Sequence, residues 1–205
     1  MSLSRSLSRP ITGIIFDLDG TLVESRLNFK LIRQQIGCPQ SMDLLEYVDK
    51  LTCTTAKQNA NNIIMQHEHQ DAINAKPIKG MHDLLKAIKL ALLPTAIVTR
   101  NSLAASSIKV FQNNITISPV LTREDFPAKP APDALLAIAA QWHMDPQDII
   151  YVGDYLYDIQ AANNAGMIAC FINHGIESAY QHLADIVIED LSQLQSLLIN
   201  RSPSN

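Results

Sequence analysis

The stretch IIFDLDGT, residues 14–21, places two carboxylates directly behind an apolar run. A continuous apolar run is typical of a strand that is buried on both faces of a parallel sheet. Asp17 and Asp19 follow the run with one residue between them. Like charges held close together raise each other's cost of ionisation, so such a pair generally shares a cation or a proton. The stretch therefore predicts a buried strand that ends at a charged site.

Further apolar runs alternate with helical patterns along the chain. The runs expected to form strands are residues 11–17, 94–99, 148–154, 167–173 and a segment from Ala184, with a weaker edge candidate at 115–122 that contains Pro119. The helical patterns are residues 80–92, 102–114, 131–142 and 157–166. Strands that alternate with helices predict an α/β fold, a Rossmann-like parallel sheet flanked by helices.

Residues 26–76 break this alternation, because they have helical character and no convincing strand pattern. We expect them to form a small inserted all-α cap domain, called the insert below. Thr55 and Gln58 resemble a capping box at the start of its last helix. The expected catalytic core is then residues 11–25 and 77–200, with flexible termini at 1–10 and 201–205. An insert placed directly after the two aspartates can close over whatever they bind.

Composition excludes several functional classes. The 205 residues are 47% hydrophobic and 18% charged, with a formal net charge of -4, so no basic face for nucleic acid is expected. No apolar run approaches the roughly 18 residues that indicate a membrane helix. Cys38, Cys53 and Cys170 lie far apart and predict free thiols in a reducing cytoplasm. We expect a cytoplasmic monomer or small homo-oligomer that binds neither nucleic acid nor membrane.

Four separated segments carry the candidate chemistry. They are DLDGT at residues 17–21, IVTRN at 97–101, AKPAP at 128–132 and VGDYLYDI at 152–159. In a parallel α/β sheet, ligands bind outside the carboxyl ends of the strands, where Asp17, Thr99 and Asp154 are expected. Mg²⁺ prefers oxygen ligands and binds one or two carboxylates together with substrate phosphate. The segments therefore predict a site for Mg²⁺ and a phosphoryl group.

The two carboxylates of the first segment need not act alike. Asp17, at the end of its strand, can attack phosphorus and become an aspartyl-phosphate. Asp19 can project to the same side, protonate the leaving oxygen and later accept a proton from water. Thr99 and Lys129 can supply a hydrogen bond and a positive charge to the phosphate.

In this order, and each after an expected strand, the four segments resemble the four motifs of the haloacid dehalogenase superfamily. The resemblance spans about residues 12–190. It implies that Asp17 is the nucleophile and Asp19 the general acid and base. It also implies that the insert is similar to the helical cap of the phosphoglycolate phosphatase and β-phosphoglucomutase-like branch. One departure is Tyr155, which stands where relatives commonly have serine or threonine.

The resemblance assigns roles to the other polar residues. Thr99 and Lys129 would hold and neutralise the phosphoryl group, and Asp154 would bind Mg²⁺ with Asp17 and the Asp19 carbonyl. Asp158 would support the metal or the lysine. The expected metal site comprises Asp17, Asp19, Asp154 and Asp158, and the expected substrate-binding residues are Gly20, Thr21, Thr99, Arg100, Asn101 and Lys129.

These observations predict an enzyme, a Mg²⁺-dependent phosphatase that acts on a small phosphorylated metabolite. Two alternatives remain open. A phosphomutase of the β-phosphoglucomutase type has the same motifs and differs only in its products. A catalytically idle binding protein on the same fold is less favoured, because every expected catalytic residue is present.

Overall fold

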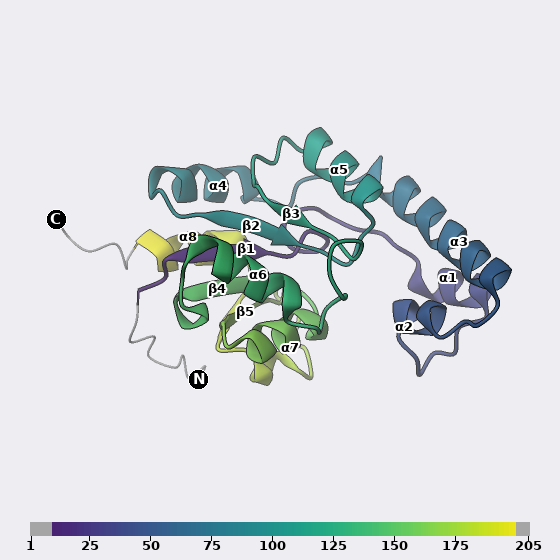
Figure 1. Cartoon of the computed structure of the whole chain (residues 1–205). Helices are drawn as coiled ribbons and strands as arrows, with labels where there is room; N and C mark the ends of the chain where they lie inside the picture. Colours follow the sequence, from purple (N-terminus) through teal and green to yellow (C-terminus); the bar gives the residue numbers. More distant parts are fainter. Residues whose placement is uncertain (1–9, 200–205) are drawn as a thin grey trace.

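The computed structural model describes residues 10–199, so the expectation of flexible termini falls largely outside the described residues. Within this part of the chain, six strands form one parallel sheet in the order β3-β2-β1-β4-β5-β6 (Figure 1). The strands are β1 Gly13–Phe16, β2 Thr95–Val98, β3 Val120–Leu121, β4 Ile149–Gly153, β5 Ile168–Ile172 and β6 Ile186–Ile188. The first strand thus lies in the interior of the sheet, between β2 and β4.

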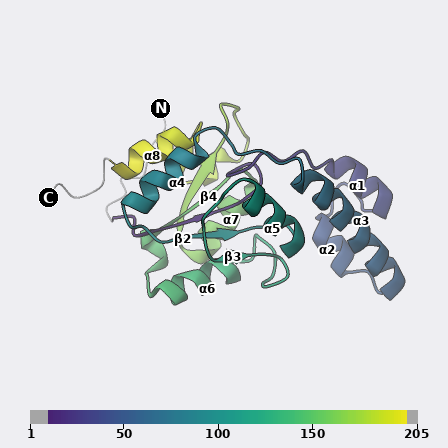
Figure 2. The same ribbon diagram turned by 90° about the horizontal axis from the view of Figure 1, so that it is seen from above.

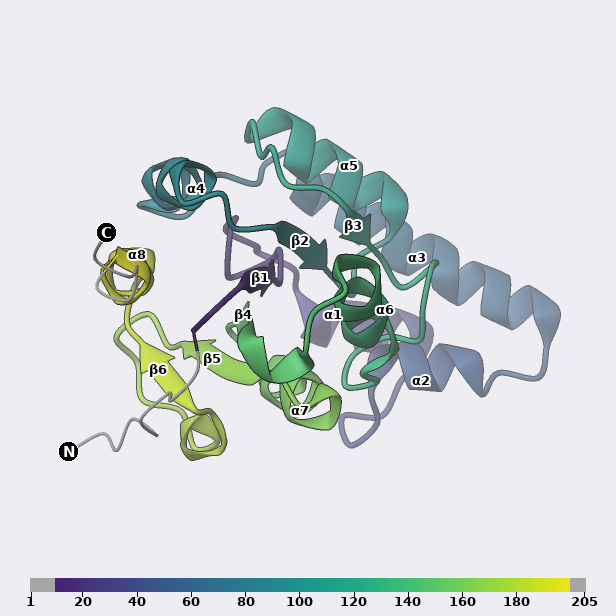
Figure 3. The ribbon, with the colours of Figure 1, turned by 60° about the vertical axis from the view of Figure 1, so that its left-hand side comes forward.

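Helices cover both faces of the sheet (Figure 3). These are α4 Met81–Leu90, α5 Leu103–Gln112, α6 Asp133–Trp142, α7 Leu156–Ala165 and α8 Leu191–Ile199. Alternate residues of β1 point to opposite faces: Ile14 and Phe16 pack in the cluster with α4 and α8, and Ile15 packs in the cluster with α6 and α7. The Rossmann-like α/β fold expected from the sequence is confirmed.

The weakest expected strand is the shortest one observed. Of the run at residues 115–122, only Val120 and Leu121 pair with β2, and they lie at the edge of the sheet. Pro119 precedes them and lacks an N–H that could continue the ladder, which is the physical reason for the short strand.

Three helices, α1 Phe29–Ile36, α2 Leu44–Asp49 and α3 Thr54–Ala72, form the insert (Figure 2). They surround a hydrophobic cluster of their own, which contains Ile32, Val48 and Ile64. The capping box expected at Thr55 and Gln58 is wrong. The helix begins two residues earlier than a cap at Thr55 would place it, so that Cys53 occupies the cap position without a side-chain hydrogen bond.

The insert contacts the sheet domain through helix packing and through charges. Helix α3 lies beside α5. Asp43, which caps α2, pairs with Arg100 at 2.7 Å, and Glu68 of α3 pairs with Arg123. All four side chains are at least partly buried, so these ion pairs are more strongly shielded from water and salt than surface pairs. Of the helices between residues 10 and 199, none combines the length and hydrophobicity that crossing a bilayer requires.

Candidate active site

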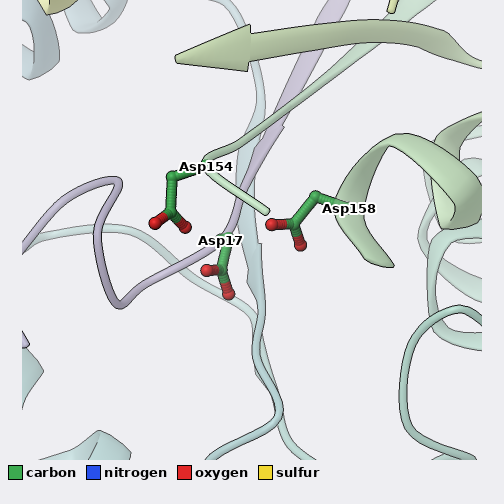
Figure 4. A group of neighbouring side chains, drawn as sticks. All are labelled: Asp17, Asp154 and Asp158. Atoms are coloured by element: carbon green, nitrogen blue, oxygen red, sulfur yellow. The ribbon is translucent and has the colours of Figure 1, made fainter. Parts of the chain in front are cut away.

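Three carboxylates converge at the carboxyl edge of the sheet (Figure 4). Asp17 follows β1, Asp154 follows β4, and Asp158 lies in the first turn of α7. Because β1 and β4 are parallel neighbours, their ends deliver both side chains to one place. One oxygen from each of the three carboxylates lies within 4.8 Å of the others. Such a group of oxygen ligands can hold a divalent cation.

Lys129 is the positive charge of this cluster. Its Nζ lies 2.6 Å from Asp17 Oδ1 and 2.6 Å from Asp158 Oδ1, and it also donates to the Tyr151 hydroxyl at 2.7 Å. The lysine is buried, and burial alone would lower its pKa, but the two carboxylates raise the pKa above its ordinary value. The ammonium therefore stays charged, with each of its three protons facing an acceptor.

The carboxylates approach closely because glycine stands at two positions. A Cβ at Gly20 would lie 2.1 Å from Asp154 Oδ2, and Gly20 also adopts a φ of +72° that side chains disfavour. A Cβ at Gly153 would lie 2.3 Å from the Cβ of Asp158. Any side chain at either position would push a carboxylate out of the cluster.

Ionisation of this cluster is unfavourable without a further cation. Burial, followed by the charge of Asp158 and Asp19, raises the pKa of Asp17 to about 7 although Lys129 opposes the rise. Burial and the charges of Asp17 and Asp158 raise the pKa of Asp154 to about 8. One lysine does not balance three carboxylates, of which two are buried and one is partly buried, so a divalent cation fits the residues present.

Asp19 lies beside this cluster but has different partners. Its carboxylate accepts from Nδ2 of Asn101 at 3.0 Å and from Nζ of Lys109 at 2.6 and 2.7 Å. Asn101 also donates to Oγ1 of Thr99, through its side chain and its backbone N–H, at 3.2 Å each. The hydroxyl at the end of β2 is therefore joined to Asp19 by hydrogen bonds.

These groups line a cavity of about 450 Å³ between the sheet domain and the insert. Its polar end is formed by the carboxylates, Thr99, Asn101 and Lys129. The insert contributes apolar side chains, among them Leu27, Phe29, Ile32, Leu44, Leu45 and Ile64. The insert also contributes the charged side chains of Arg33, Asp43 and Glu68. A phosphorylated molecule with its phosphate beside the carboxylates would face both kinds of side chain with the rest of its surface.

Arg100 closes one side of the cavity. One Nη atom contacts both carboxylate oxygens of Asp43, at 2.8 and 2.7 Å, and the other donates to the carbonyl of Lys129. The guanidinium also lies 4.5 Å from the centre of the Tyr157 ring. Although partial burial opposes ionisation, Arg100 and the N–H of Glu46 lower the pKa of Asp43. The pair is therefore charged at neutral pH and joins the insert to the sheet domain.

The structure brings most of the expected site residues together, but not all of them. The residues that line the cavity are Asp17, Asp19, Gly20, Thr99, Arg100, Asn101, Lys129, Asp154 and Asp158. Thr21 does not line it: the residue is fully buried, and its hydroxyl has no hydrogen-bond partner among the described residues. Asp158 already accepts from Lys129, Tyr151 and the N–H of Tyr155, which favours support of the lysine over direct metal binding.

Sequence reasoning missed several residues that shape the site. Tyr151 lies within the apolar run that forms β4, and only its hydroxyl group indicated that it could bind a polar side chain such as Lys129. Lys109 shares a buried helix face with Ala105 and Ser106, and a lysine among small residues at that spacing was a usable signal. Asp43 and Glu68 gave none, because their partners are distant in the sequence.

Comparisons with known proteins agree with this architecture. Residues 14–172 match the family model described as haloacid dehalogenase-like hydrolase. The chain is 28% identical to an uncharacterised hydrolase of Saccharomyces cerevisiae, over 93% of this chain and 92% of the relative. It is 24% identical to an N-acetylmuramic acid 6-phosphate phosphatase of Pseudomonas aeruginosa, over 92% of this chain and 95% of that relative. A solved structure from Haemophilus somnus, described as a predicted phosphoglycolate phosphatase, has a TM-score of 0.72 at 20% identity and covers 93% of this chain and 99% of its own.

The raised pKa values predict how stability depends on pH. A carboxylate whose pKa is higher in the folded than in the unfolded state favours folding at low pH, and this contribution is lost as pH rises through the folded-state pKa. For Asp17 and Asp154 the loss extends to about pH 7 and 8. We therefore expect Asp154→Asn to raise the melting temperature in EDTA, by more at pH 8.5 than at pH 5.

Thermal unfolding at the two pH values measures this difference. Asp125→Asn is the control, and it is expected to lower the melting temperature. Hydrogen bonds from Thr122 lower the pKa of Asp125, so its carboxylate stabilises the fold at pH values above its ordinary pKa. An Asp154→Asn effect that is the same at both pH values would contradict the electrostatic account of the cluster.

Proposed function

The chain belongs to the haloacid dehalogenase-like hydrolase family, and on this basis we propose that it is a Mg²⁺-dependent phosphatase that hydrolyses a small phosphorylated metabolite. The observation that carries the proposal is the cluster of Asp17, Asp154 and Asp158 around Lys129, at the floor of a cavity that the insert covers. The phosphatase named among the relatives supports the same reaction class.

Asp17 is the proposed nucleophile. Lys129 holds one of its oxygens at 2.6 Å and thereby fixes the orientation of the carboxylate. An Asp17 oxygen attacks phosphorus, the bond from phosphorus to the leaving oxygen breaks, and an aspartyl-phosphate forms. Thr99 and Lys129 lie at the same end of the cavity, where a hydroxyl and an ammonium can hydrogen-bond the phosphoryl oxygens.

Asp19 is the proposed general acid and base. It gives a proton to the leaving oxygen in the first half-reaction. It then accepts a proton from the water that attacks phosphorus, so that phosphate leaves and the Asp17 carboxylate is regenerated. The surroundings of the two carboxylates favour this division of roles. Asp17 belongs to the cluster with Asp154 and Asp158, whereas the carboxylate of Asp19 accepts hydrogen bonds from Asn101 and Lys109.

Asp17 and Asp154 are the side chains that would hold Mg²⁺, together with the backbone carbonyl of Asp19. When bound, the ion neutralises the crowded carboxylates and withdraws charge from the phosphoryl oxygens. Asp158 keeps Lys129 in place and accepts from the N–H of Tyr155, so the departure at position 155 leaves this support intact. The fit of the ion rests on the oxygens of Asp17 and Asp154, which lie within 4.8 Å of each other, and on Gly20, which leaves room for the Asp154 carboxylate.

The insert is proposed to act as a cap that closes over the substrate. The apolar and charged side chains that it contributes suit a leaving group with both nonpolar and polar surface, and the small cavity suits a metabolite. Closure excludes water until the phosphoryl group has moved to Asp17. Three free cysteines, Cys38, Cys53 and Cys170, favour the cytoplasm as the site of action.

Asp17→Asn is expected to abolish phosphate release, by at least about 1,000-fold in kcat, because the amide is a far weaker nucleophile than a carboxylate. The measurement is Mg²⁺-dependent release of phosphate from a panel of phosphorylated metabolites. Removal of divalent ions with EDTA is expected to have the same effect on the wild-type protein, and added Mg²⁺ to reverse it.

Asp133→Asn is the matched control, since this exposed aspartate lies on α6 and is expected to leave turnover unchanged. Turnover that persists in Asp17→Asn would refute the nucleophile assignment. Isomeric phosphate esters in place of free phosphate would identify the alternative, a phosphomutase.

Asp43→Asn tests the ion pair between the cap and Arg100. Asparagine is as good a helix N-cap as aspartate, so helix α2 keeps its cap and only the charge is lost. We expect KM to rise about tenfold, which corresponds to ~1.4 kcal/mol, with a smaller change in kcat. Asp49→Asn, on the same helix but in the exposed pair with Lys57, is expected to change neither constant. Equal effects of the two substitutions would show that the pair with Arg100 does not hold the cap.

A further inference from the structure

Lys109 is a fully buried cation that lies between the candidate acid and the cap. Its side chain has 0% exposure, and its Nζ lies 2.6 and 2.7 Å from the two oxygens of Asp19 and 2.7 Å from Oδ2 of Asp71. An ammonium removed from water is stable only when hydrogen-bonded acceptors surround it. Helix α5 thus carries a positive charge that serves two carboxylates from different parts of the chain.

Asp71 joins the two segments that connect the insert to the sheet domain. It lies in the last turn of α3, just before the second connection, which is the segment that leads from α3 back to the sheet domain. Its Oδ1 accepts from the N–H of Arg26 at 2.6 Å, and its Oδ2 accepts from the hydroxyl of Ser25 at 3.0 Å. Both of these residues belong to the first connection, which is the segment that leads from β1 to α1. Asp71 is therefore placed where the cap is attached.

These contacts form one continuous chain of hydrogen bonds. It runs from Oγ1 of Thr99 through Asn101 to Asp19, then through Lys109 to Asp71 and the first connection. Each link is 3.2 Å or shorter. The hydroxyl at the phosphate end of the cavity is thus connected to the attachment of the cap.

We propose that Lys109 is a positioning residue, which fixes the Asp19 carboxylate for proton transfer and ties that position to the cap through Asp71. The inference rests on the proposed function, because it assigns a partner to the proposed acid. A proton donor must lie within hydrogen-bond reach of the leaving oxygen, and a carboxylate held by both oxygens has little freedom to turn away. Asp19 keeps a partly exposed side chain that lines the cavity, so it remains accessible to a substrate.

The test compares two leaving groups. A basic leaving group, such as an alkyl alcohol, needs protonation as it departs, whereas p-nitrophenolate leaves with little help. We expect Lys109→Met and Lys109→Gln to lower kcat/KM for an alkyl phosphate about 10- to 100-fold more than for p-nitrophenyl phosphate. The ratio of the two kcat/KM values is diagnostic, because a merely structural role for Lys109 would lower kcat/KM for both substrates by the same factor.

Lys50→Met is the matched control, because this lysine forms an exposed ion pair with Glu46 on α2. It is expected to change neither the constants nor their ratio. Circular dichroism and thermal unfolding identify variants that fail to fold, and Lys109→Gln, which keeps an N–H donor but no charge, provides the ratio if Lys109→Met is one of them.

A second readout does not depend on turnover. Asp71→Asn removes the charge at the cap attachment, so hydrogen exchange of a peptide spanning residues 24–28 is expected to accelerate relative to the wild-type protein. In this variant Lys109 still holds Asp19, and the ratio between the two substrates is expected to stay at its wild-type value.

Three outcomes are informative. An equal loss for both substrates in the Lys109 variants would overturn the positioning role. Unchanged exchange at residues 24–28 in Asp71→Asn would overturn the tie to the cap. A wild-type protein that hydrolyses no phosphomonoester would contradict the proposed function, whereas the exchange experiment would still decide whether Asp71 holds the cap attachment.

Discussion

The crowding of buried carboxylates around Lys129 is the constraint on which the rest of the structure depends. Asp17 and Asp154 come from neighbouring strands, and Asp158 comes from the helix that follows the second of them. Their negative charges exceed the single positive charge of the lysine, and burial raises the pKa of Asp17 and of Asp154. A site of this kind lowers its free energy by binding a divalent cation and, next to it, a group that such a cation attracts.

The fold and the position of this cluster could be predicted from the sequence because both follow from local patterns. Apolar runs locate the strands, and a parallel sheet brings their carboxyl ends to one edge, so Asp17, Thr99 and Asp154 had to converge. Side-chain partners could not be predicted in the same way. Lys109 and Asp71 are 38 residues apart, and their contact depends on how two helices pack. The sequence likewise does not indicate that Thr21 is buried and does not line the cavity.

Ion pairs connect the insert to the edge of the sheet that carries the candidate site. Asp43 pairs with the residue that follows Thr99, and Glu68 accepts from the N–H of Ser102 and pairs with Arg123. Asp71 shares a lysine with Asp19. Each of these three carboxylates of the insert therefore contacts a residue adjacent to the candidate site, or a cation that also contacts Asp19. These contacts join the insert to the groups that line the cavity at the carboxyl edge of the sheet.

A crystal structure determined with Mg²⁺ and trifluoroberyllate, a mimic of a phosphoryl group on aspartate, tests the central claim most directly. We expect the mimic on an oxygen of Asp17 and one Mg²⁺ ion bound by Asp17 and Asp154, with Lys129 in contact with the mimic. An ion bound elsewhere, or the mimic absent from Asp17 at saturating concentration, would contradict the claim that these carboxylates form a site for a divalent cation and a phosphoryl group.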